Sequence, residues 1–232
     1  MMNDKILEDF ISIVGVKNII TNSKDLEKYN KDWRGFYNNK SLGILFPENS
    51  EIIKKIIKYC FEKNIKIVPQ GGNTSLTGAS VPTYDNQEII INFSKMNKIL
   101  EIDKSNLTVL VESGLILSDL KNYLDKENLY FPIDLSSSGS CMIGGNIATN
   151  AGGINALKYG SMKDNVIGIE IVTGDGKILS SLSKMKKNNK GYDLKSIICN
   201  SEGTLGLISK ALLKIYPKPI DNFTFFASYY DL

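Results

Sequence analysis

The chain has 232 residues, of which 42% are hydrophobic, so it can bury the core of one domain or of two small ones. Its 28 Lys and Arg against 25 Asp and Glu give a formal net charge of +3, which is too weak to indicate a nucleic-acid partner. The sequence has no apolar stretch of about 18 residues, no histidine and three widely spaced cysteines, so we expect no transmembrane segment, zinc site or disulfide framework, and a cytoplasmic location.

The first half of the sequence predicts helices and strands in alternation. Residues 1–10 are typical of a charged amphipathic helix and not of a signal peptide. Residues 50–61 place isoleucines at helical spacing, after Pro47 and a capping Asn49-Ser50 pair. The apolar runs 65–68, 89–93 and 107–111 predict strands.

The second half predicts one helix followed mainly by strands. Residues 115–124 have helical spacing, and residues 166–173 and 177–179 predict strands joined by a Gly-Asp-Gly hairpin turn. A further strand is expected over 207–215, and an aromatic-rich one over 220–232. The Lys-rich run 184–190 between these strands is typical of a solvated loop.

A glycine-rich turn follows the apolar run 65–68, with the sequence PQGGNTSLTG at 69–78. Small residues at such a turn let backbone N–H groups converge on an anion, most simply a pyrophosphate. The turn lacks the Lys of a Walker loop, and Pro82 disfavours the helix that a Rossmann fingerprint requires. The plainer alternative is that Gly71, Gly72 and Gly78 only form tight turns.

Two further segments favour a ligand over that alternative. Residues 140–153 combine two Gly pairs with Asn and Thr, a composition that predicts no ordinary core helix, because each interior Gly costs roughly 1 kcal/mol relative to Ala. Residues 201–206 again place small residues where a strand begins. Together the three segments indicate a site shaped around a large planar or polyanionic ligand.

Four stretches in this order carry a resemblance to a known family: PQGGNTSLTG, GSCMIGGNIATNAGG, YG followed by VIGIEIVTGDG, and GYDLKSIICNSEGTLGLIS followed by PKP. They resemble the FAD-binding half of the FAD-linked 2-hydroxy-acid dehydrogenases, which include D-2-hydroxyglutarate dehydrogenase, D-lactate dehydrogenase and the flavin subunit of glycolate oxidase. The resemblance runs from about Tyr29 to Pro219. The flavin reductase of peptidoglycan synthesis is a related alternative whose motifs match less well.

The resemblance implies an α+β fold of the vanillyl-alcohol-oxidase (PCMH) type, in which two subdomains hold FAD and a substrate-binding cap follows. We accordingly expect a first FAD-binding subdomain with N-terminal helices at residues 1–104, a second at 105–219, and the start of a truncated cap at 220–232.

The same resemblance implies roles for individual residues toward FAD. The glycine-rich turn is expected to wrap the pyrophosphate, through Pro69, Gly71, Gly72, Asn73, Thr74, Ser75, Leu76 and Gly78. The ribityl and isoalloxazine side is expected to be lined by Pro132, Asp134, Ser140, Gly144, Gly145, Asn146, Thr149 and Asn150. The remaining cofactor contacts are expected from Tyr159, Gly160, Glu202, Gly203, Gly206 and Ile208, although Ile208 fits a core position equally well.

Several positions depart from the family pattern. Ser75 and Ala79 stand where the family usually has Gly, Met142 where close relatives have His, and Lys158 where they often have Arg. None of these changes removes the implied FAD site. Cys141 lies inside the flavin-like segment and is expected to be a small packing residue, as are Cys60 and Cys199 in apolar runs.

The resemblance assigns no catalytic and no metal-binding residue to this chain, because the family's metal site, base and carboxylate clamp lie in the cap or beyond. We therefore expect a separately encoded cap polypeptide or electron acceptor as a partner. We also expect FAD to be bound non-covalently, because the sequence has no His for a histidyl bond. The exposed aromatic end is the expected surface for that partner, at Phe223, Phe225, Phe226, Tyr229 and Tyr230. The alternative is a FAD-binding module, or a split-gene remnant, that has no turnover on its own.

Overall fold

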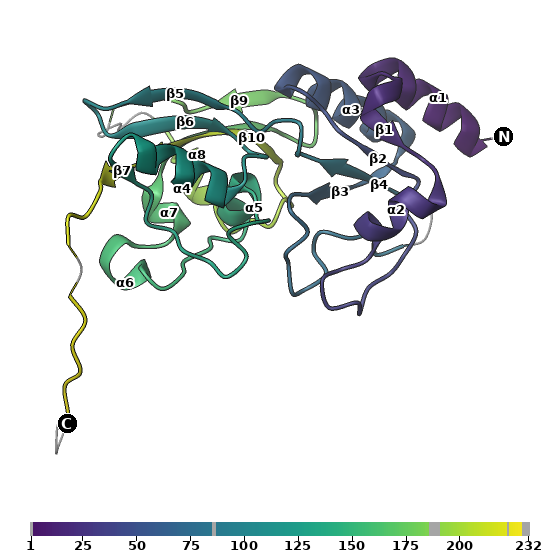
Figure 1. Cartoon of the computed structure of the whole chain (residues 1–232). Coiled ribbons are helices and arrows are strands. Elements are labelled where there is room, and N and C mark those ends of the chain that lie inside the picture. The colour runs from purple at the N-terminus through teal and green to yellow at the C-terminus, as the bar shows by residue number, and fades with distance from the viewer. Residues whose placement is uncertain (1, 85–86, 186–190, 222, 229–232) are drawn as a thin grey trace.

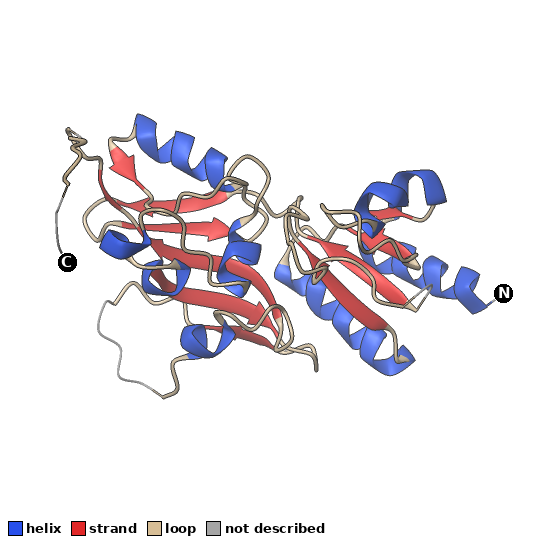
Figure 2. Ribbon diagram, turned by 90° about the horizontal axis from the view of Figure 1, so that it is seen from below, coloured by secondary structure: helices blue, strands red, loops and turns tan. Residues whose placement is uncertain are grey.

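The computed structural model describes residues 2–84, 87–185, 191–221 and 223–228. Two sheets, each with its own helices, make up the two halves of the molecule (Figure 1). The N-terminal half carries the first sheet and the C-terminal half carries the second, and loops of both halves meet between the two sheets (Figure 2).

The N-terminal half has a four-stranded sheet in the order β1-β2-β4-β3, in which β2 and β3 run parallel to β4 and β1 runs antiparallel to β2. Its elements in chain order are α1 (Met2–Val14), η1 (Val16–Asn18), β1 (Ile19–Ile20), α2 (Ser23–Asn30), β2 (Gly43–Leu45), α3 (Ser50–Lys63), β3 (Lys66–Gln70) and β4 (Glu88–Asn92). The central strand β4 is buried along its whole length, and α1 and α3 pack their apolar faces against this core.

Helix α3 shows how local sequence sets the geometry of this half. The Asn49 side chain accepts a hydrogen bond from the N–H of Ile52 at 3.0 Å, as an N-cap does. Ile53, Ile56 and Ile57 are buried on one face, and the helix ends at Asn64 in the left-handed conformation. The helix predicted over 50–61 is confirmed, and α1 confirms the N-terminal helix as far as the described residues reach, Met1 being outside them.

The C-terminal half has an antiparallel five-stranded sheet in the order β5-β6-β10-β8-β9, and a separate pair formed by β11 and β7. Its elements are β5 (Ile99–Asp103), β6 (Thr108–Glu112), α4 (Leu117–Lys126), β7 (Leu129–Tyr130), α5 (Ile143–Ala148), α6 (Ala156–Tyr159), α7 (Met162–Asn165), β8 (Val166–Val172), β9 (Ile178–Ser180), α8 (Leu194–Ile198), β10 (Leu207–Lys214) and β11 (Tyr216–Pro217).

Most predicted elements of both halves are confirmed. Strands β3, β4, β6, β8, β9 and β10 and helix α4 lie where the sequence predicts them, and β8 and β9 form the predicted hairpin. The expected subdomain boundary at 104/105 falls between β5 and β6, which pair in the second sheet. The chain passes from the first sheet to the second earlier, between Asn92 and Ile99.

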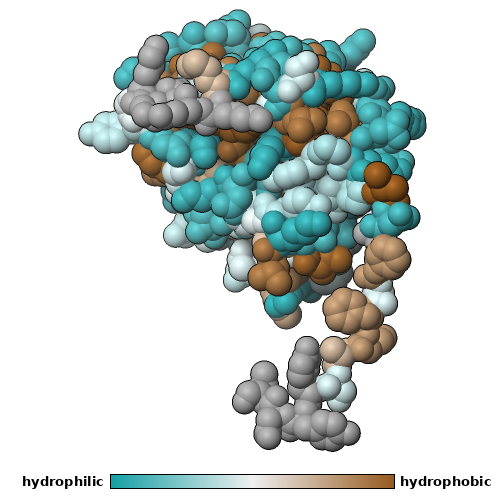
Figure 3. Space-filling view, turned by 90° about the vertical axis from the view of Figure 1, so that its left-hand side faces the viewer, coloured by the Kyte–Doolittle hydropathy of each residue, from teal (hydrophilic) through white to brown (hydrophobic). Residues whose placement is uncertain are grey.

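Two predictions about local structure are wrong. The glycine-rich segment 140–153 contains a helix after all, α5, with Ile143 and Ile147 buried in the core of the C-terminal half. The described residues of 220–228 form no strand, because no neighbouring strand pairs with their backbone. They extend away from the body, with Phe223, Phe225 and Phe226 almost fully exposed (Figure 3).

Other expectations concern the surface and lie partly outside the described residues. Lys184 forms an ion pair with Glu101 on the surface, which agrees with a solvated run, whereas residues 186–190 are outside the described ranges. Tyr229 and Tyr230 are also outside them. Within the described ranges, no helix is long and apolar enough to cross a membrane.

A partly buried carboxylate links the two halves. Glu170 on β8 accepts hydrogen bonds from Ser50 Oγ at the start of α3 and from Ser209 Oγ on β10, the latter at 2.8 Å. Lys210 Nζ completes the group with an ion pair at 3.0 Å. Burial alone raises the pKa of Glu170, but the hydrogen bonds from Ser50, Lys210 and Ser209 outweigh it, so the net effect is a pKa below the ordinary value.

Replacing Glu170 by Gln is expected to lower the free energy of unfolding by about 1–3 kcal/mol at pH 7, because charge-assisted hydrogen bonds are lost. A lowered folded-state pKa means that the stabilisation is present above the unfolded-state pKa and is lost as pH falls through the folded-state pKa. The difference in the free energy of unfolding between wild type and Glu170→Gln, measured by urea denaturation, should therefore shrink as the pH is lowered through the folded-state pKa.

Glu101 offers the matched control, since its carboxylate pairs with Lys184 but is half exposed. Glu101→Gln should change the free energy of unfolding by less than about 0.5 kcal/mol. Equal losses in the two variants would show that the Glu170 group has no special role in joining the halves.

Candidate functional site

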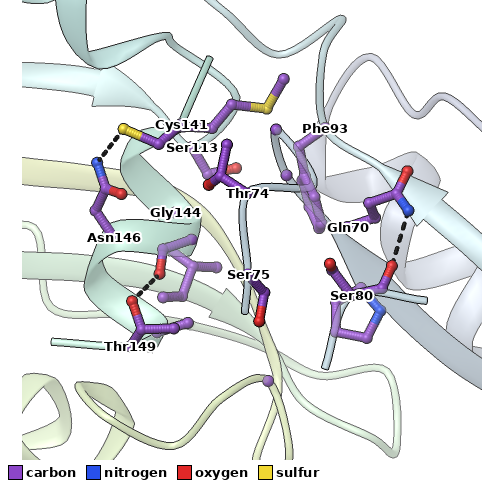
Figure 4. Close-up of a pocket in the computed structure, with 18 of the residues that line it drawn as sticks. Gln70, Thr74, Ser75, Ser80, Phe93, Ser113, Cys141, Gly144, Asn146 and Thr149 are labelled. Atoms are coloured by element: carbon purple, nitrogen blue, oxygen red, sulfur yellow. Dashed lines mark hydrogen bonds between the residues drawn. The ribbon is translucent and has the colours of Figure 1, made fainter. Parts of the chain in front are cut away.

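A cavity of about 260 Å³ lies where the three glycine-rich segments meet. This volume is slightly below the roughly 300–1,000 Å³ of typical ligand sites, so a dinucleotide would extend beyond the enclosed part. The N-terminal half contributes the turn after β3 and the end of β4, and the C-terminal half contributes α5, the end of β6 and the start of β10 (Figure 4). The site therefore depends on both halves.

Gln70, at the end of β3, holds the glycine-rich turn in place. Its side chain is fully buried, and its Nε2 donates to the carbonyl oxygens of Tyr29 and Ser80, both at 2.8 Å. Its Oε1 accepts from Asn92 Nδ2 at 3.2 Å. Because Gln70 and Ser80 lie at opposite ends of the turn, these bonds fix where the turn begins and ends (Figure 4).

Asn73 determines the shape of the turn between those ends. Its φ of 53° is in the left-handed region that Asn tolerates better than most residues. Its Nδ2 donates to the carbonyl of Lys31 at 2.8 Å, and its Oδ1 accepts from Ser80 Oγ at 2.8 Å. Both polar atoms of the side chain thus bond to the protein, and these bonds fix the turn between Lys31 and Ser80.

Helix α5 forms the opposite wall. The N–H of Gly144 donates to the carbonyl of Ser113 at 2.7 Å, and a Cβ at Gly144 would lie only 2.8 Å from the Ser113 Cβ. This close packing explains why a helix forms here despite two glycines: tertiary contacts offset the propensity cost. Gly145 differs from Gly144, because a Cβ there would meet no atom within 4 Å. Its position is open space at the cavity.

The third glycine-rich segment lies beside the first two. Glu202 and Gly203 both have positive φ, at 51° and 79°, and the N–H of Glu202 donates to the carbonyl of Ala148 on α5 at 2.9 Å. A Cβ at Gly203 would lie 2.6 Å from Pro69 Cγ on the turn. The segment thus contacts both the turn and α5.

The lining of the cavity is polar but nearly uncharged. Glu202 is its one charged residue among those that the structure describes, and no Lys or Arg is among them. An anion bound here would be held by backbone N–H groups and hydroxyls, as the absence of a Walker lysine predicts. The described part of the chain also has no group of three or more His, Cys, Asp or Glu that could hold a metal.

Fourteen of the residues expected to contact FAD line this cavity. They are Pro69, Gly71, Gly72, Asn73, Thr74, Ser75, Gly144, Gly145, Asn146, Thr149, Glu202, Gly203, Gly206 and Ile208. The other eight lie outside its lining. They are Leu76, Gly78, Pro132, Asp134, Ser140, Asn150, Tyr159 and Gly160. A direct cofactor contact remains a prediction for every one of these residues.

Most of the residues outside the lining have contacts within the protein. Asn150 Oδ1 accepts from the N–H of Lys163, and Asp134 pairs with Lys121 at 2.6 Å. Tyr159 packs edge-to-face against the rings of Tyr130 and Tyr216.

Sequence reasoning missed thirteen lining residues. They are Gln70, Ala79, Ser80, Phe93, Ser113, Leu135, Ser137, Cys141, Met142, Ala148, Ala151, Ser201 and Leu207. Gln70 and Ser201 could have been predicted as lining residues, because each lies next to an expected residue in its glycine-rich segment. Nothing in the local sequence marks Phe93 or Ser113, which reach the cavity only because β4 and β6 end beside it.

The cysteines behave as packing residues. All three are free and buried, and burial raises the pKa of the Cys60 thiol to about 12. Cys141 belongs to the core of the C-terminal half and also lines the cavity, with Asn146 Nδ2 at 3.5 Å from its sulfur (Figure 4).

The open space at Gly145 generates a prediction about binding. Gly145→Leu is expected to leave the fold intact and to raise stability by up to about 1 kcal/mol, because Leu is the better helix former. The new side chain would occupy cavity space, so the Kd for FAD should rise by about 10-fold or more, measured by quenching of flavin fluorescence. Gly139→Leu is the matched control, since a Cβ at Gly139 also meets nothing within 4 Å but lies outside the lining. Equal FAD affinity in the two variants would contradict the assignment of this cavity.

Comparison with known proteins shows which family the chain belongs to. The sequence matches the FAD binding domain family over residues 41–181. It is 41% identical over 217 residues to the mitochondrial D-2-hydroxyglutarate dehydrogenase of Arabidopsis thaliana, a match that covers 94% of this chain and 38% of that protein. It is 38% identical over 221 residues to the D-2-hydroxyglutarate–pyruvate transhydrogenase of Saccharomyces cerevisiae, covering 94% of this chain and 44% of that protein. The chain thus spans less than half the length of these relatives.

Solved structures show the same fold at lower identity. Alkyldihydroxyacetonephosphate synthase matches with a TM-score of 0.84 and 24% identity, over 94% of this chain and 41% of that one. p-Cresol methylhydroxylase matches with a TM-score of 0.80 and 24% identity, over 94% of this chain and 44% of that one. The PCMH-type fold expected from the sequence is confirmed.

The cavity itself fits an FAD. Small residues line it from three sides, the place of the missing Gly145 Cβ is open, and its donors suit a pyrophosphate without a metal. The matched residues 41–181 are more than half of the 232-residue sequence, and the resemblance to the FAD-binding half of the FAD-linked 2-hydroxy-acid dehydrogenases is confirmed. This chain belongs to the FAD binding domain family.

Proposed function

We propose that the chain is the FAD-binding part of a flavin-dependent dehydrogenase that oxidises a D-2-hydroxy acid of the 2-hydroxyglutarate, lactate or glycolate class. The observation that carries the proposal is the 41% identity to a D-2-hydroxyglutarate dehydrogenase across 94% of the chain, which includes all three cavity-forming segments. The names of the relatives support the substrate class, and the cavity supports the cofactor.

FAD, when bound, would supply a hydride acceptor, flavin N5, for oxidation of the hydroxyl-bearing carbon of the substrate. The chain's own residues hold the cofactor in position. The turn fixed by Gln70, helix α5 and the 201–206 segment would surround it. Hydrogen bonds hold the turn together internally and join α5 to the 201–206 segment, and Gly203 packs closely against Pro69 of the turn.

The same reaction needs a base for the hydroxyl proton and a cation for the substrate carboxylate. The described cavity lining provides no Lys, Arg or His, and its one carboxylate residue, Glu202, is exposed to solvent and would repel the carboxylate of a substrate. We therefore propose that these groups come from polypeptide corresponding to the part of the relatives that this chain does not match.

Exposed aromatic side chains after residue 220 support the proposal that a further polypeptide covers this part of the chain. Phe223, Phe225 and Phe226 are 91%, 85% and 102% exposed, respectively. Neighbouring aromatic side chains left in water are typical of a contact surface. The alternative function, a FAD-binding module without turnover of its own, is favoured only by the lack of a cation in the described cavity lining.

The proposal predicts how the flavin of the purified chain responds to substrates. D-2-Hydroxyglutarate, D-lactate and glycolate should each bleach the bound flavin little or not at all in anaerobic mixing, because the missing base alone accounts for a loss of roughly 10²–10⁴ in rate. Dithionite should bleach it normally, which controls for a damaged cofactor. Adding the polypeptide that matches the remainder of the relatives should restore bleaching by one of the acids.

Two outcomes would decide against parts of this proposal. Rapid bleaching of the isolated chain by one acid would show that it has its own base and clamp. No bleaching even with the added polypeptide would favour the module without turnover.

Non-covalent binding is a separate expectation. The sequence has no His for a histidyl bond, and Cys141 is the one cysteine in the cavity lining. Acid denaturation should therefore release all the yellow flavin into the supernatant. Flavin that stays with the wild-type polypeptide but not with Cys141→Ser would reveal a thioether instead.

A further inference from the structure

Ser113 has a buried hydroxyl without a partner, directly at the cavity. The residue follows β6 and is 1% exposed. Among the described residues, four side chains have a buried polar atom without a hydrogen-bond partner: Ser41, Thr108, Ser113 and Ser201. Of these four, Ser113 and Ser201 line the cavity, and Ser113 is the more deeply buried of the two.

The backbone of Ser113 is fixed from both sides. Its N–H donates to the carbonyl of Ser209 on β10 at 3.0 Å, and its carbonyl accepts from the N–H of Gly144 on α5 at 2.7 Å. The backbone of Ser113 therefore cannot shift far to bring Oγ to a protein partner. Figure 4 shows it among the lining side chains near Gly144, where the absence of a Cβ leaves the two backbones in close contact.

A buried hydroxyl without a partner destabilises a protein, so such a group in a native structure calls for a ligand, a water or a function. We propose that Ser113 Oγ forms a hydrogen bond to the FAD held in this cavity. The proposal rests on FAD as the cofactor and on no step of the proposed oxidation. The resemblance assigned no role to Ser113, and its position next to the cavity follows only from the packing of β6 against β10 and α5.

The structure supplies a matched control for this proposal. Ser41 carries the same kind of unpartnered, buried hydroxyl, is 5% exposed, and lies outside the cavity lining. In the flavin-free chain, Ser113→Ala and Ser41→Ala should both leave the thermal midpoint unchanged or slightly higher, because each removes an unpaired buried polar atom.

The two variants should differ once FAD is added. The Kd for FAD, measured by quenching of flavin fluorescence, should rise about 3- to 30-fold in Ser113→Ala, as expected for one lost hydrogen bond, and stay at the wild-type value in Ser41→Ala. Ser113→Cys, which keeps the shape of the side chain but has a weak donor, should fall between Ser113→Ala and wild type.

The same titration with ADP and with riboflavin assigns the bond to one half of the cofactor. A loss confined to ADP or to riboflavin supports a bond to that half. Wild-type affinity of Ser113→Ala for FAD and both fragments would overturn the proposal, as would an equal loss in Ser41→Ala. These measurements involve no hydroxy acid, so they remain valid if the chain proves to have no dehydrogenase role.

Discussion

The site depends on three places where the two halves approach so closely that no side chain fits between them. A Cβ at Gly72 of the N-terminal half would lie 1.8 Å from the carbonyl oxygen of Ser140, and a Cβ at Gly114 would lie 1.8 Å from that of Phe93. Gly203 adds the third contact, against the ring of Pro69. Any larger residue at these positions must push the halves apart, because the opposing atoms of Ser140 and Phe93 are backbone. The glycines of the motifs therefore serve the junction between the halves as much as they serve the ligand.

This geometry explains how a cavity without a cation in its described lining can suit an anionic cofactor. With one Glu and no cation in the described lining, attraction must come from N–H groups and hydroxyls already held in place. Gln70 holds the turn in place by donating hydrogen bonds to the Tyr29 and Ser80 carbonyls. The hydrogen bonds of Glu170 hold α3 in place against the second sheet. The cost of arranging these groups is met during folding and not during binding, which is how a preorganised site gains affinity without charge.

The sequence allowed prediction wherever a local pattern determines the structure. The isoleucine spacing correctly predicted α3, and the apolar runs correctly predicted the central strands. The glycine-rich segments and the family resemblance led to fourteen residues that line the cavity. Prediction failed where distant contacts decide the outcome. Propensity alone excluded a helix over 140–153, yet packing of Gly144 on Ser113 stabilises α5. The aromatic-rich composition suggested a strand after residue 220, but a strand also needs a neighbour, and the described sheets offer none to these residues. No local sequence pattern indicated that Ser113 lines the cavity, because the residues that hold it there come from β10 and α5.

The unpaired hydroxyl of Ser113 is a consequence of packing within the C-terminal half. Because the N–H of Ser113 is bonded to Ser209 and its carbonyl to Gly144, the backbone cannot move toward a protein acceptor, and Oγ has no partner in the flavin-free chain. The folded chain thus carries a small energetic penalty that a ligand can remove, and this couples cofactor binding to stability. Residues expected to contact FAD and residues that join the halves are accordingly difficult to separate by sequence pattern alone, since Gly72 and Gly203 belong to both groups.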